Sequence, residues 1–317
     1  MRLKLSPFVF MFALVVGNSL AQADGSKQLI WIDSDPSCGL GATYDVDDCW
    51  AILRASNSNA LKIVGISAVF GNASIDMTHS VSETLVNMIN TNRDSGKLPV
   101  PVMGAKDEAQ FSPSKATFEL SEALSNERLI IVALGPLTNI AALIKHHPDL
   151  TKNIEKIIAV AGQTPGQTFH TGNSSLMHLH DLNFQKDTLA FKMVLESGIP
   201  VVLTPFELAR QNKITEKELL ESSRGDEVES WLAEISRPWL NFWKKYLGED
   251  GFYPFDSMAI GHLIEPENIS CSQQFAKVIE RRSIFVNSRD ILEVSTIQKR
   301  SRPVVYCNRM NQRVPIS

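Results

Sequence analysis

Short apolar runs alternate with amphipathic segments along most of the chain. Six runs have the length of buried strands: Gln28–Asp33, Lys62–Val69, Leu98–Met103, Leu129–Leu134, Lys156–Ala161 and Pro200–Thr204. Helical spacing of apolar positions predicts helices between them, at Ile75–Asn92, Leu137–His146 and Asp187–Ser197. Nearly continuous apolar strands separated by helices are typical of a parallel sheet that is covered on both faces. We therefore predict a Rossmann-like α/β fold with a mostly parallel central sheet flanked by helices.

The pattern becomes mainly helical after about residue 210. Glu216–Tyr246 and Asp256–Leu263 have helical spacing, and two further strands are predicted at Ala276–Val286 and Pro303–Cys307. Neither a linker nor a repeat nor a low-complexity stretch divides the sequence. We therefore predict one domain over residues 24–317, with a helical insertion in its C-terminal part.

Residues 1–23 have the layout of a secretory signal peptide. Arg2 and Lys4 form a basic start, Phe8–Val16 is apolar, and Ala21-Gln22-Ala23 places small residues before a cleavage site. The apolar run has about half of the roughly 20 residues that a membrane span needs. We expect cleavage before Asp24 and export to the periplasm or the extracellular space, without a membrane partner.

Composition and charge exclude several classes of protein. The chain has 317 residues, of which 44% are hydrophobic and 21% are charged, and its net charge is −4. Lysines and arginines are scattered, whereas binding to a phosphate backbone requires a surplus of cations. We therefore expect no nucleic-acid partner. Average Gly, Pro and Cys contents exclude fibrous, disordered and disulfide-scaffold proteins.

The four cysteines lie after the expected cleavage site, and an oxidising compartment permits disulfides between them. None has the CxxC spacing that would favour a zinc or thioredoxin-like site. Cys271 and Cys307 lie at the ends of two predicted strands, which antiparallel pairing would bring together. The alternatives are that Cys271 and Cys307 form a bridge or remain two buried thiols. A Cys38–Cys49 bridge across a short loop is a further possibility.

Five aspartates follow the first apolar run within sixteen residues: Asp33, Asp35, Asp45, Asp47 and Asp48. In parallel α/β sheets, ligands bind at the carboxyl ends of the strands, where this cluster begins. The carboxylates would repel one another unless a cation lay among them, and carboxylate-only sets favour Ca²⁺ or Mg²⁺. Helix capping explains Asp47 and Asp48, but it does not explain Asp33 and Asp35 as well.

This segment resembles the nucleoside hydrolase signature DxDPGxDDxxA, with Asp33-Ser34-Asp35-Pro36 followed by Asp47-Asp48 and an apolar helix. Further pieces occur in the family's order: Val69-Phe70-Gly71-Asn72, Leu134-Gly135-Pro136-Leu137-Thr138-Asn139, Asp181-Leu182-Asn183-Phe184 with Asp187, and Phe255-Asp256-Ser257-Met258-Ala259. The similarity runs from residue 29 to about 262. It is to inosine/uridine-preferring nucleoside hydrolases, of which this chain would be a divergent, secreted member.

The resemblance implies calcium-dependent hydrolysis of the N-glycosidic bond of ribonucleosides to free base and ribose. It implies that Asp35, Asp48, Asp256 and the backbone carbonyl of Leu134 bind Ca²⁺, and that Asp35 is the catalytic base toward the water that the ion activates. It further implies sugar-binding or supporting roles for a second set of residues: Asp33, Asp47, Asn72, Asp181 and Asn183. The family also implies a small nucleoside substrate and a homodimer or homotetramer.

The chemistry of these residue types agrees with that reaction. Cleavage of an N-glycoside passes through an oxocarbenium-like state, and carboxylates near the sugar favour its positive charge. Asparagine amides both donate and accept hydrogen bonds, which suits contacts with sugar hydroxyls.

The sequence departs from the family pattern in three places. Residues 37–44 lengthen the loop between the aspartate pairs, and they form either a flap over the site or an outward bulge. Phe255 stands where a histidine often assists the leaving base, and a histidine- and glycine-rich flap expected before residue 127 is missing. His178 and His180 are candidates to aid the leaving group, because histidine titrates near neutral pH; surface histidines are the plainer interpretation.

Trp231, Trp239, Trp243 and Tyr246 recur at near-helical spacing, which indicates core packing more often than base stacking. Two other functions fit parts of the sequence. In a Mg²⁺-dependent phosphatase of the haloacid-dehalogenase type, Asp33 and Asp35 would form the nucleophile pair, although Pro36 counts against it. The other is an exported nucleoside- or sugar-binding protein with a degenerate site.

Overall fold

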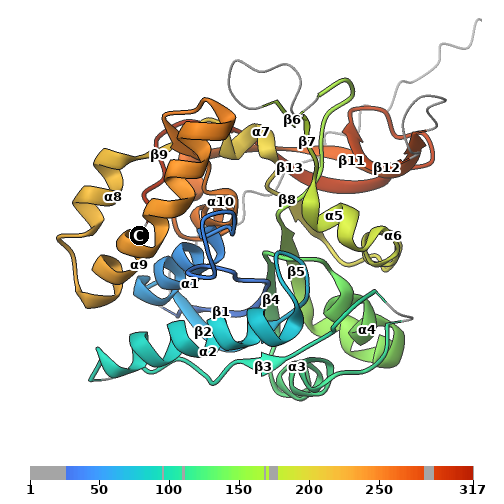
Figure 1. Ribbon diagram of the computed structural model, residues 1–317. Helices are drawn as coiled ribbons and strands as arrows, with labels where there is room; N and C mark the ends of the chain where they lie inside the picture. The colour runs from blue at the N-terminus through green and yellow to red at the C-terminus, as the bar shows by residue number, and fades with distance from the viewer. Residues whose placement is uncertain are drawn as a thin grey trace, which may run out of the picture.

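A nine-stranded sheet forms the centre of the computed structural model, which describes residues 26–94, 96–108, 111–167, 169–170, 178–281 and 289–316 (Figure 1). The strand order is β12-β11-β13-β8-β5-β4-β1-β2-β3. The bounds are β1 Gln28–Ser34, β2 Leu61–Ala68, β3 Val102–Met103, β4 Leu129–Ala133, β5 Ile154–Ala159, β8 Val201–Leu203, β11 Ile269–Arg281, β12 Arg289–Ser295 and β13 Arg302–Met310. All pairings from β13 to β3 are parallel, whereas β11 is antiparallel to both of its neighbours. The predicted α/β fold with a mostly parallel sheet is confirmed.

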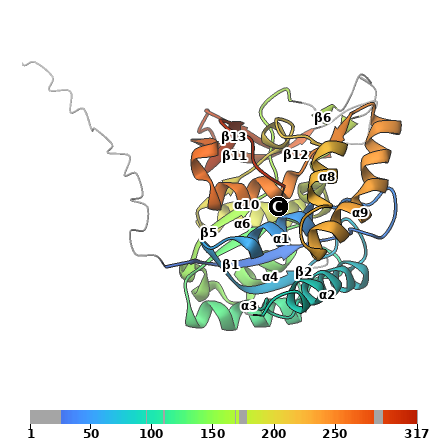
Figure 2. The ribbon, with the colours of Figure 1, turned by 90° about the vertical axis from the view of Figure 1, so that its left-hand side faces the viewer.

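Helices cover both faces of the sheet, so its central strands are apolar on both sides. The helices are α1 Asp47–Asn57, α2 Ile75–Thr91, α3 Lys115–Asn126, α4 Thr138–His146, α5 Leu182–Lys186, α6 Thr188–Glu196, α7 Phe206–Ala209, α8 Glu216–Ser222, α9 Glu227–Phe242 and α10 Phe255–Ile264. Ile30 and Ile32 of β1 face a core that contains α1, α9 and α10, whereas Trp31 faces a second core with α3, α4 and α6. Figures 1 and 2 both place α2, α3 and α4 at one end of the molecule and β11, β12 and β13 at the other.

Several sequence-based boundaries are wrong for local reasons. The predicted strand Leu98–Met103 is reduced to Val102–Met103, because Pro99 and Pro101 lack the N–H that a ladder needs. The predicted helix Glu216–Tyr246 breaks after Ser222, and Asp226 then caps α9 by accepting a hydrogen bond from the backbone N–H of Glu229 at 2.9 Å.

The C-terminal strands and one helix also differ from the prediction. The strand predicted at Ala276–Val286 begins earlier, at Ile269, and its described part ends at Arg281; residues 282–288 lie outside the described residues. β12 and α3 were not predicted. The expected signal peptide, residues 1–23, also lies outside the described part. None of the described helices has the length and hydrophobicity required to cross a bilayer.

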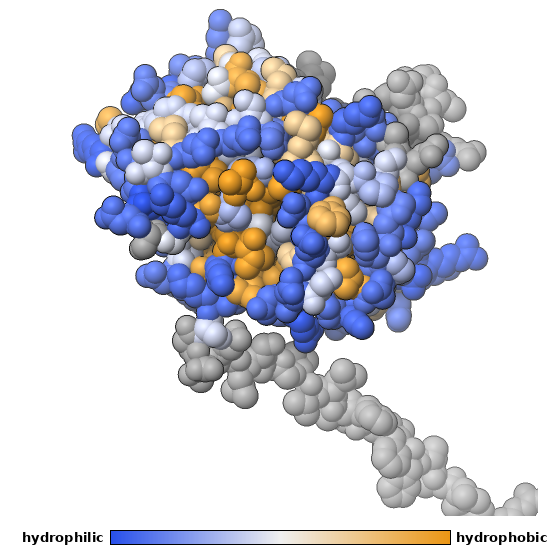
Figure 3. Space-filling view, turned by 90° about the horizontal axis from the view of Figure 1, so that it is seen from below, coloured by the Kyte–Doolittle hydropathy of each residue, from blue (hydrophilic) through white to orange (hydrophobic). Residues whose placement is uncertain are grey.

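Exposed apolar side chains gather at the end of the molecule formed by α2, β3 and α3. They are Met77, Val100, Met103 and Phe118, with exposed fractions between 37% and 74%. Figure 3 views this end, and apolar atoms form a patch at its centre. A patch of this kind is typical of an interaction surface.

Two disulfides are present, and they resolve the alternatives that the sequence left open. Cys271 of β11 lies opposite Cys307 of β13 in the antiparallel ladder, and the two are bonded. A second bond joins Cys38 to Cys49 in the first turn of α1.

We predict that replacing Cys271 and Cys307 together with alanine lowers the free energy of unfolding by about 4 kcal/mol, since loop-closure entropy grows with the 36-residue separation. Removing Cys38–Cys49, with a separation of 11 residues, should cost about 3 kcal/mol. Urea unfolding of both variants beside the oxidised wild type measures the two losses. Unchanged midpoints would show that neither bond constrains the unfolded chain.

Candidate active site

Buried aspartates from three segments meet at the carboxyl end of the sheet. Asp35 follows β1, Asp47 and Asp48 form the first turn of α1, and Asp256 lies in the first turn of α10. Carboxylate oxygens of Asp47, Asp48 and Asp256 all lie within 4.8 Å of one another. Because α1 packs against α10, side chains about 200 residues apart in the sequence share one site.

Hydrogen bonds fix the orientation of Asp35 and Asp48. Asp48 Oδ1 accepts hydrogen bonds from the Ser34 hydroxyl at 2.5 Å and from the backbone N–H of Asp35 at 3.1 Å. The backbone N–H of Asn72 donates to Asp35 Oδ2 at 2.7 Å, and the amide Nδ2 of Asn72 donates to Asp48 Oδ2 at 3.3 Å. Gly71 permits this contact, because a β-carbon there would lie 1.9 Å from Asp35 Oδ2.

Asp33 supports the site from within the sheet. Its Oδ1 accepts hydrogen bonds from the hydroxyl of Ser67, at 2.5 Å, and from the amide of Asn139, at 2.8 Å. Asn139 also donates to the carbonyl of Ala68 and accepts from the backbone N–H of Ala105, so one amide links three strand ends. Asp33 does not line the cavity, and neither do Asp35 and Asp48. The hydrogen bonds that Asp33 accepts from Ser67 and Asn139 support the positioning role among the two roles considered for it.

The electrostatics of this cluster oppose simultaneous ionisation. Burial raises the pKa of Asp33 and of Asp48 to about 6. Burial and the neighbouring carboxylates raise the pKa values of Asp35, Asp47 and Asp256 well above the usual range. None of the ion pairs in the described part of the chain includes these aspartates.

Two buried oxygens of the cluster have no hydrogen-bond partner among the described residues, Asp33 Oδ2 and Asp35 Oδ1. Unpaired buried carboxylates are costly unless a cation compensates them. An all-oxygen set of this kind fits a hard divalent ion. The donor chemistry therefore fits the metal site that the sequence predicts.

Leu134, directly after β4, lies beside the start of α5, which supplies Asp181 and Asn183. The amide of Asn183 donates hydrogen bonds to the carbonyl of Leu134 at 2.6 Å and to the carbonyl of Val160 at 3.1 Å. The carbonyl of Leu134 is the backbone ligand that the family resemblance predicts. Asp181 accepts hydrogen bonds from the backbone N–H of Gly162 at 2.7 Å and, as the cap of α5, from that of Phe184 at 3.2 Å. Burial raises the pKa of Asp181 to about 6.

A cavity of about 450 Å³ opens over this cluster. Its polar part contains Asp47, Asn72, Asp181, Asn183 and Asp256. Most of the remaining wall is apolar. Its aromatic residues are Phe206, Trp239, Phe242, Trp243 and Phe255, and its aliphatic residues include Leu134, Val160, Leu182 and Leu247. Trp239 and Trp243 also belong to the hydrophobic core. These two residues therefore have the packing role that the sequence favours and also line the cavity.

The structure shows where the long loop and His180 lie relative to the cavity. Thr43 and Tyr44 line the cavity, so loop 37–44 lies over the site and does not bulge outward. His180 also lines the cavity. The backbone of His178 lies in the short strand β7 (His178–Leu179), but its side chain lies outside what the structure describes.

Sequence reasoning missed several residues that build the site. The hydroxyls of Ser34 and Ser67 donate hydrogen bonds to Asp48 and Asp33. Their only sequence signal is a hydroxyl side chain at the end of an apolar run. Phe206, Phe242 and Lys186 line the cavity but lie in helices without a distinguishing motif. Tertiary packing alone brings these residues to the site.

Comparison with known proteins gives the family. The family model described as inosine-uridine preferring nucleoside hydrolase matches residues 30–312. A probable ribonucleoside hydrolase of Dictyostelium discoideum is 24% identical, over 89% of this chain and 90% of the relative. The pyrimidine-specific ribonucleoside hydrolase RihB of Escherichia coli (strain K12) is 25% identical, over 80% of this chain and 83% of the relative.

Solved structures share the fold at lower identity. A plant nucleoside hydrolase has a TM-score of 0.74 at 18% identity, covering 90% of this chain and 95% of its own. A purine-preferring ribonucleoside hydrolase from Gardnerella vaginalis has a TM-score of 0.68 at 18% identity, covering 91% and 95%. Because the family model spans nearly the whole described chain, this protein belongs to the inosine-uridine preferring nucleoside hydrolase family and is a hydrolase acting on N-glycosyl compounds.

Proposed function

We propose that this protein is a calcium-dependent hydrolase that splits ribonucleosides into free base and ribose. One observation carries the proposal: a buried carboxylate cluster, with an oxygen that has no partner among the described residues, lies at the polar end of a cavity whose remaining wall is mostly apolar and rich in aromatic rings. Carboxylates suit a sugar that acquires positive charge, and an aromatic wall suits a planar base.

Asp35, Asp48, Asp256 and the carbonyl of Leu134 would hold the Ca²⁺ ion. When bound, the ion would supply a Lewis acid that lowers the pKa of a water molecule. The all-oxygen set favours Ca²⁺ over softer metals, which prefer nitrogen and sulfur ligands.

Asp35 would act as the general base. Its Oδ2 is held by the backbone N–H of Asn72, while its buried Oδ1 has no hydrogen-bond partner among the described residues. Oδ1 would accept a proton from the water that attacks the anomeric carbon. The buried carboxylates would then stabilise the oxocarbenium-like charge, while Asp47, Asn72, Asp181 and Asn183 contact sugar hydroxyls.

The departing base would lie against the aromatic wall. Phe255 carries no titratable proton, so it cannot protonate the base. His180 lines the cavity, and we propose it, rather than His178, as the aid to the leaving group. The relatives include a pyrimidine-specific and a purine-preferring enzyme, so a substrate panel should contain both kinds of base.

We predict that Asp35→Asn lowers the turnover of nucleosides by about 10²–10⁴-fold, the usual contribution of a positioned general base. Ribose released from a panel of purine and pyrimidine nucleosides in the presence of Ca²⁺ measures this loss. Asp149→Asn, at an exposed aspartate beyond the opposite ends of the strands, is the matched control and should keep wild-type turnover.

Two results would contradict the assignment. Wild-type turnover in Asp35→Asn would remove Asp35 from the role of base. Absence of ribose release by the wild type from every nucleoside, with nucleoside binding intact, would favour the alternative of an exported binding protein. The family match counts against the phosphatase alternative.

Calcium should stabilise the protein more strongly at pH 8 than at pH 5. Asp33 and Asp48 have pKa values raised to about 6, so without a cation their protonated forms favour the folded state. That stabilisation is fully present below the unfolded pKa, near 4, and is lost as the pH rises through 6. Ca²⁺ offsets the loss at pH 8, by about 2.7 kcal/mol at 100 times its dissociation constant, whereas protons compete with it at pH 5.

Thermal unfolding of chelator-treated protein, with and without Ca²⁺ at the two pH values, tests this expectation. Asp256→Asn should lose most of the calcium-induced shift, and Asp149→Asn should retain it. Equal shifts at both pH values, or an unaltered shift in Asp256→Asn, would contradict a carboxylate site.

We further propose that the protein is exported and forms a homodimer or homotetramer. The two disulfides support export, because such bonds persist in oxidising compartments. The exposed apolar patch around Val100 and Phe118 supports self-association.

The N-terminal sequence of the protein recovered from the periplasm or medium should begin at Asp24, because the small residues Ala21 and Ala23 suit signal peptidase. Sequential N-terminal degradation reads this directly. A chain that begins at Met1 and stays in the cytoplasm would contradict export.

A further inference from the structure

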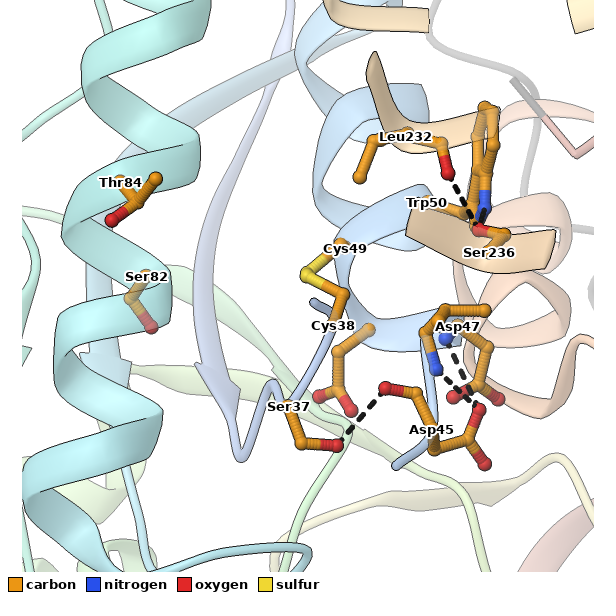
Figure 4. The surroundings of a disulfide bond; sticks show 12 residues. Ser37, Cys38, Asp45, Asp47, Cys49, Trp50, Ser82, Thr84, Leu232 and Ser236 are labelled. Carbon is orange, nitrogen blue, oxygen red and sulfur yellow. Dashed lines mark hydrogen bonds between the residues drawn. A yellow bond between two sulfur atoms is a disulfide. The ribbon is translucent and has the colours of Figure 1, made fainter. Parts of the chain in front are cut away.

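Loop 37–45, which connects β1 to α1, is anchored at both of its ends. The Cys38–Cys49 disulfide joins it to the first turn of α1, and both cysteines are buried (Figure 4). The hydroxyl of Ser37 donates to the carbonyl of Asp45 at 2.9 Å, which closes the base of the loop. The disulfide and this hydrogen bond therefore limit how far the loop can move away from α1.

The same loop packs against helix α9. Gly39 has a φ of +83°, which favours glycine, and a β-carbon built there would lie 3.5 Å from the side chain of Ile235. Trp50 of α1 donates to the hydroxyl of Ser236 at 3.0 Å, so α1 and α9 are tied together beside the loop (Figure 4). Ile235 lies one turn before Trp239, which belongs to the aromatic cavity wall.

Thr43 and Tyr44 of the loop line the cavity together with this wall. Two ring atoms of Tyr44 lie 3.5 and 3.8 Å from a β-carbon built on Gly41, so the edge of the ring lies close to this glycine of the loop. The next residue, Asp45, also lines the cavity and hydrogen-bonds the start of α1, where the carboxylates lie. The loop therefore spans from the carboxylates toward the aromatic wall.

We propose that loop 37–45 is a disulfide-anchored rim of the substrate cavity and that Tyr44 is a specificity-determining residue whose ring packs against the nucleobase. The inference rests on the proposed nucleosidase function. With the ribose held at the carboxylates, the base extends away from them, between the rim and the wall formed by Trp239 and Trp243. A phenol ring there favours a planar, aromatic leaving group.

Tyr44→Ala should raise the KM for nucleosides about tenfold, with kcat nearly unchanged, since one aromatic contact contributes about that much to binding. Tyr44→Phe should behave like the wild type, because the ring is retained. The inhibition constant of a free nucleobase should rise about tenfold in Tyr44→Ala, whereas that of free ribose should stay constant. Leu220→Ala, which removes an exposed apolar side chain of α8 outside the cavity, is the matched control.

A second arm tests the rim. Cys38→Ser with Cys49→Ser should weaken nucleobase binding in the same direction, whereas Cys271→Ser with Cys307→Ser should leave it unchanged. Unaltered KM in Tyr44→Ala, or equal losses for nucleobase and ribose, would overturn the proposal. If the wild type releases no ribose, the proposed function fails, and calorimetric titration with free nucleobase still tests whether Tyr44 contacts it.

Discussion

The rest of the site depends on the mutual repulsion of carboxylates held together out of water. Asp35, Asp47, Asp48 and Asp256 come from three segments, and each is buried. Like charges at this separation favour protonation or a bound cation over free ionisation. The surrounding donors, such as the Ser34 hydroxyl and the Asn72 amide, orient the oxygens but supply no positive charge. By packing α1 against α10, the fold brings together carboxylates that a bound cation would stabilise.

The sheet explains how that arrangement is held. Asp33 lies near the end of a central strand that has neighbours on both sides, and Asp35 follows directly after that strand. Asn139 links Asp33 to the neighbouring strand end at Ala68. Side chains are held more precisely on or beside such elements than on free loops.

The sequence predicts the parts of the structure that have a local signal. The continuous apolar strands such as Leu129–Ala133 are visible directly, and the density of aspartates between Asp33 and Asp48 indicates a cation site. Only part of the aromatic wall has such a signal. Trp239 and Trp243 recur at helical spacing, whereas Phe206 and Phe242 reach the cavity only through tertiary packing. β12 was missed because the apolar positions before it were assigned to one longer strand, Ala276–Val286, and no strand was predicted between that segment and Pro303–Cys307.

The cavity draws its two ends from different parts of the chain. Most of the polar end comes from residues 47–183, with Asp256 as the exception, whereas the aromatic wall comes from residues 206–255, apart from the rim loop. Substitutions at Phe206, Trp239, Phe242 or Trp243 would therefore alter the wall without removing a carboxylate. Under the proposed function, substitutions in α7, α9 and the rim loop would change which base is accepted while the carboxylates that serve hydrolysis stay in place.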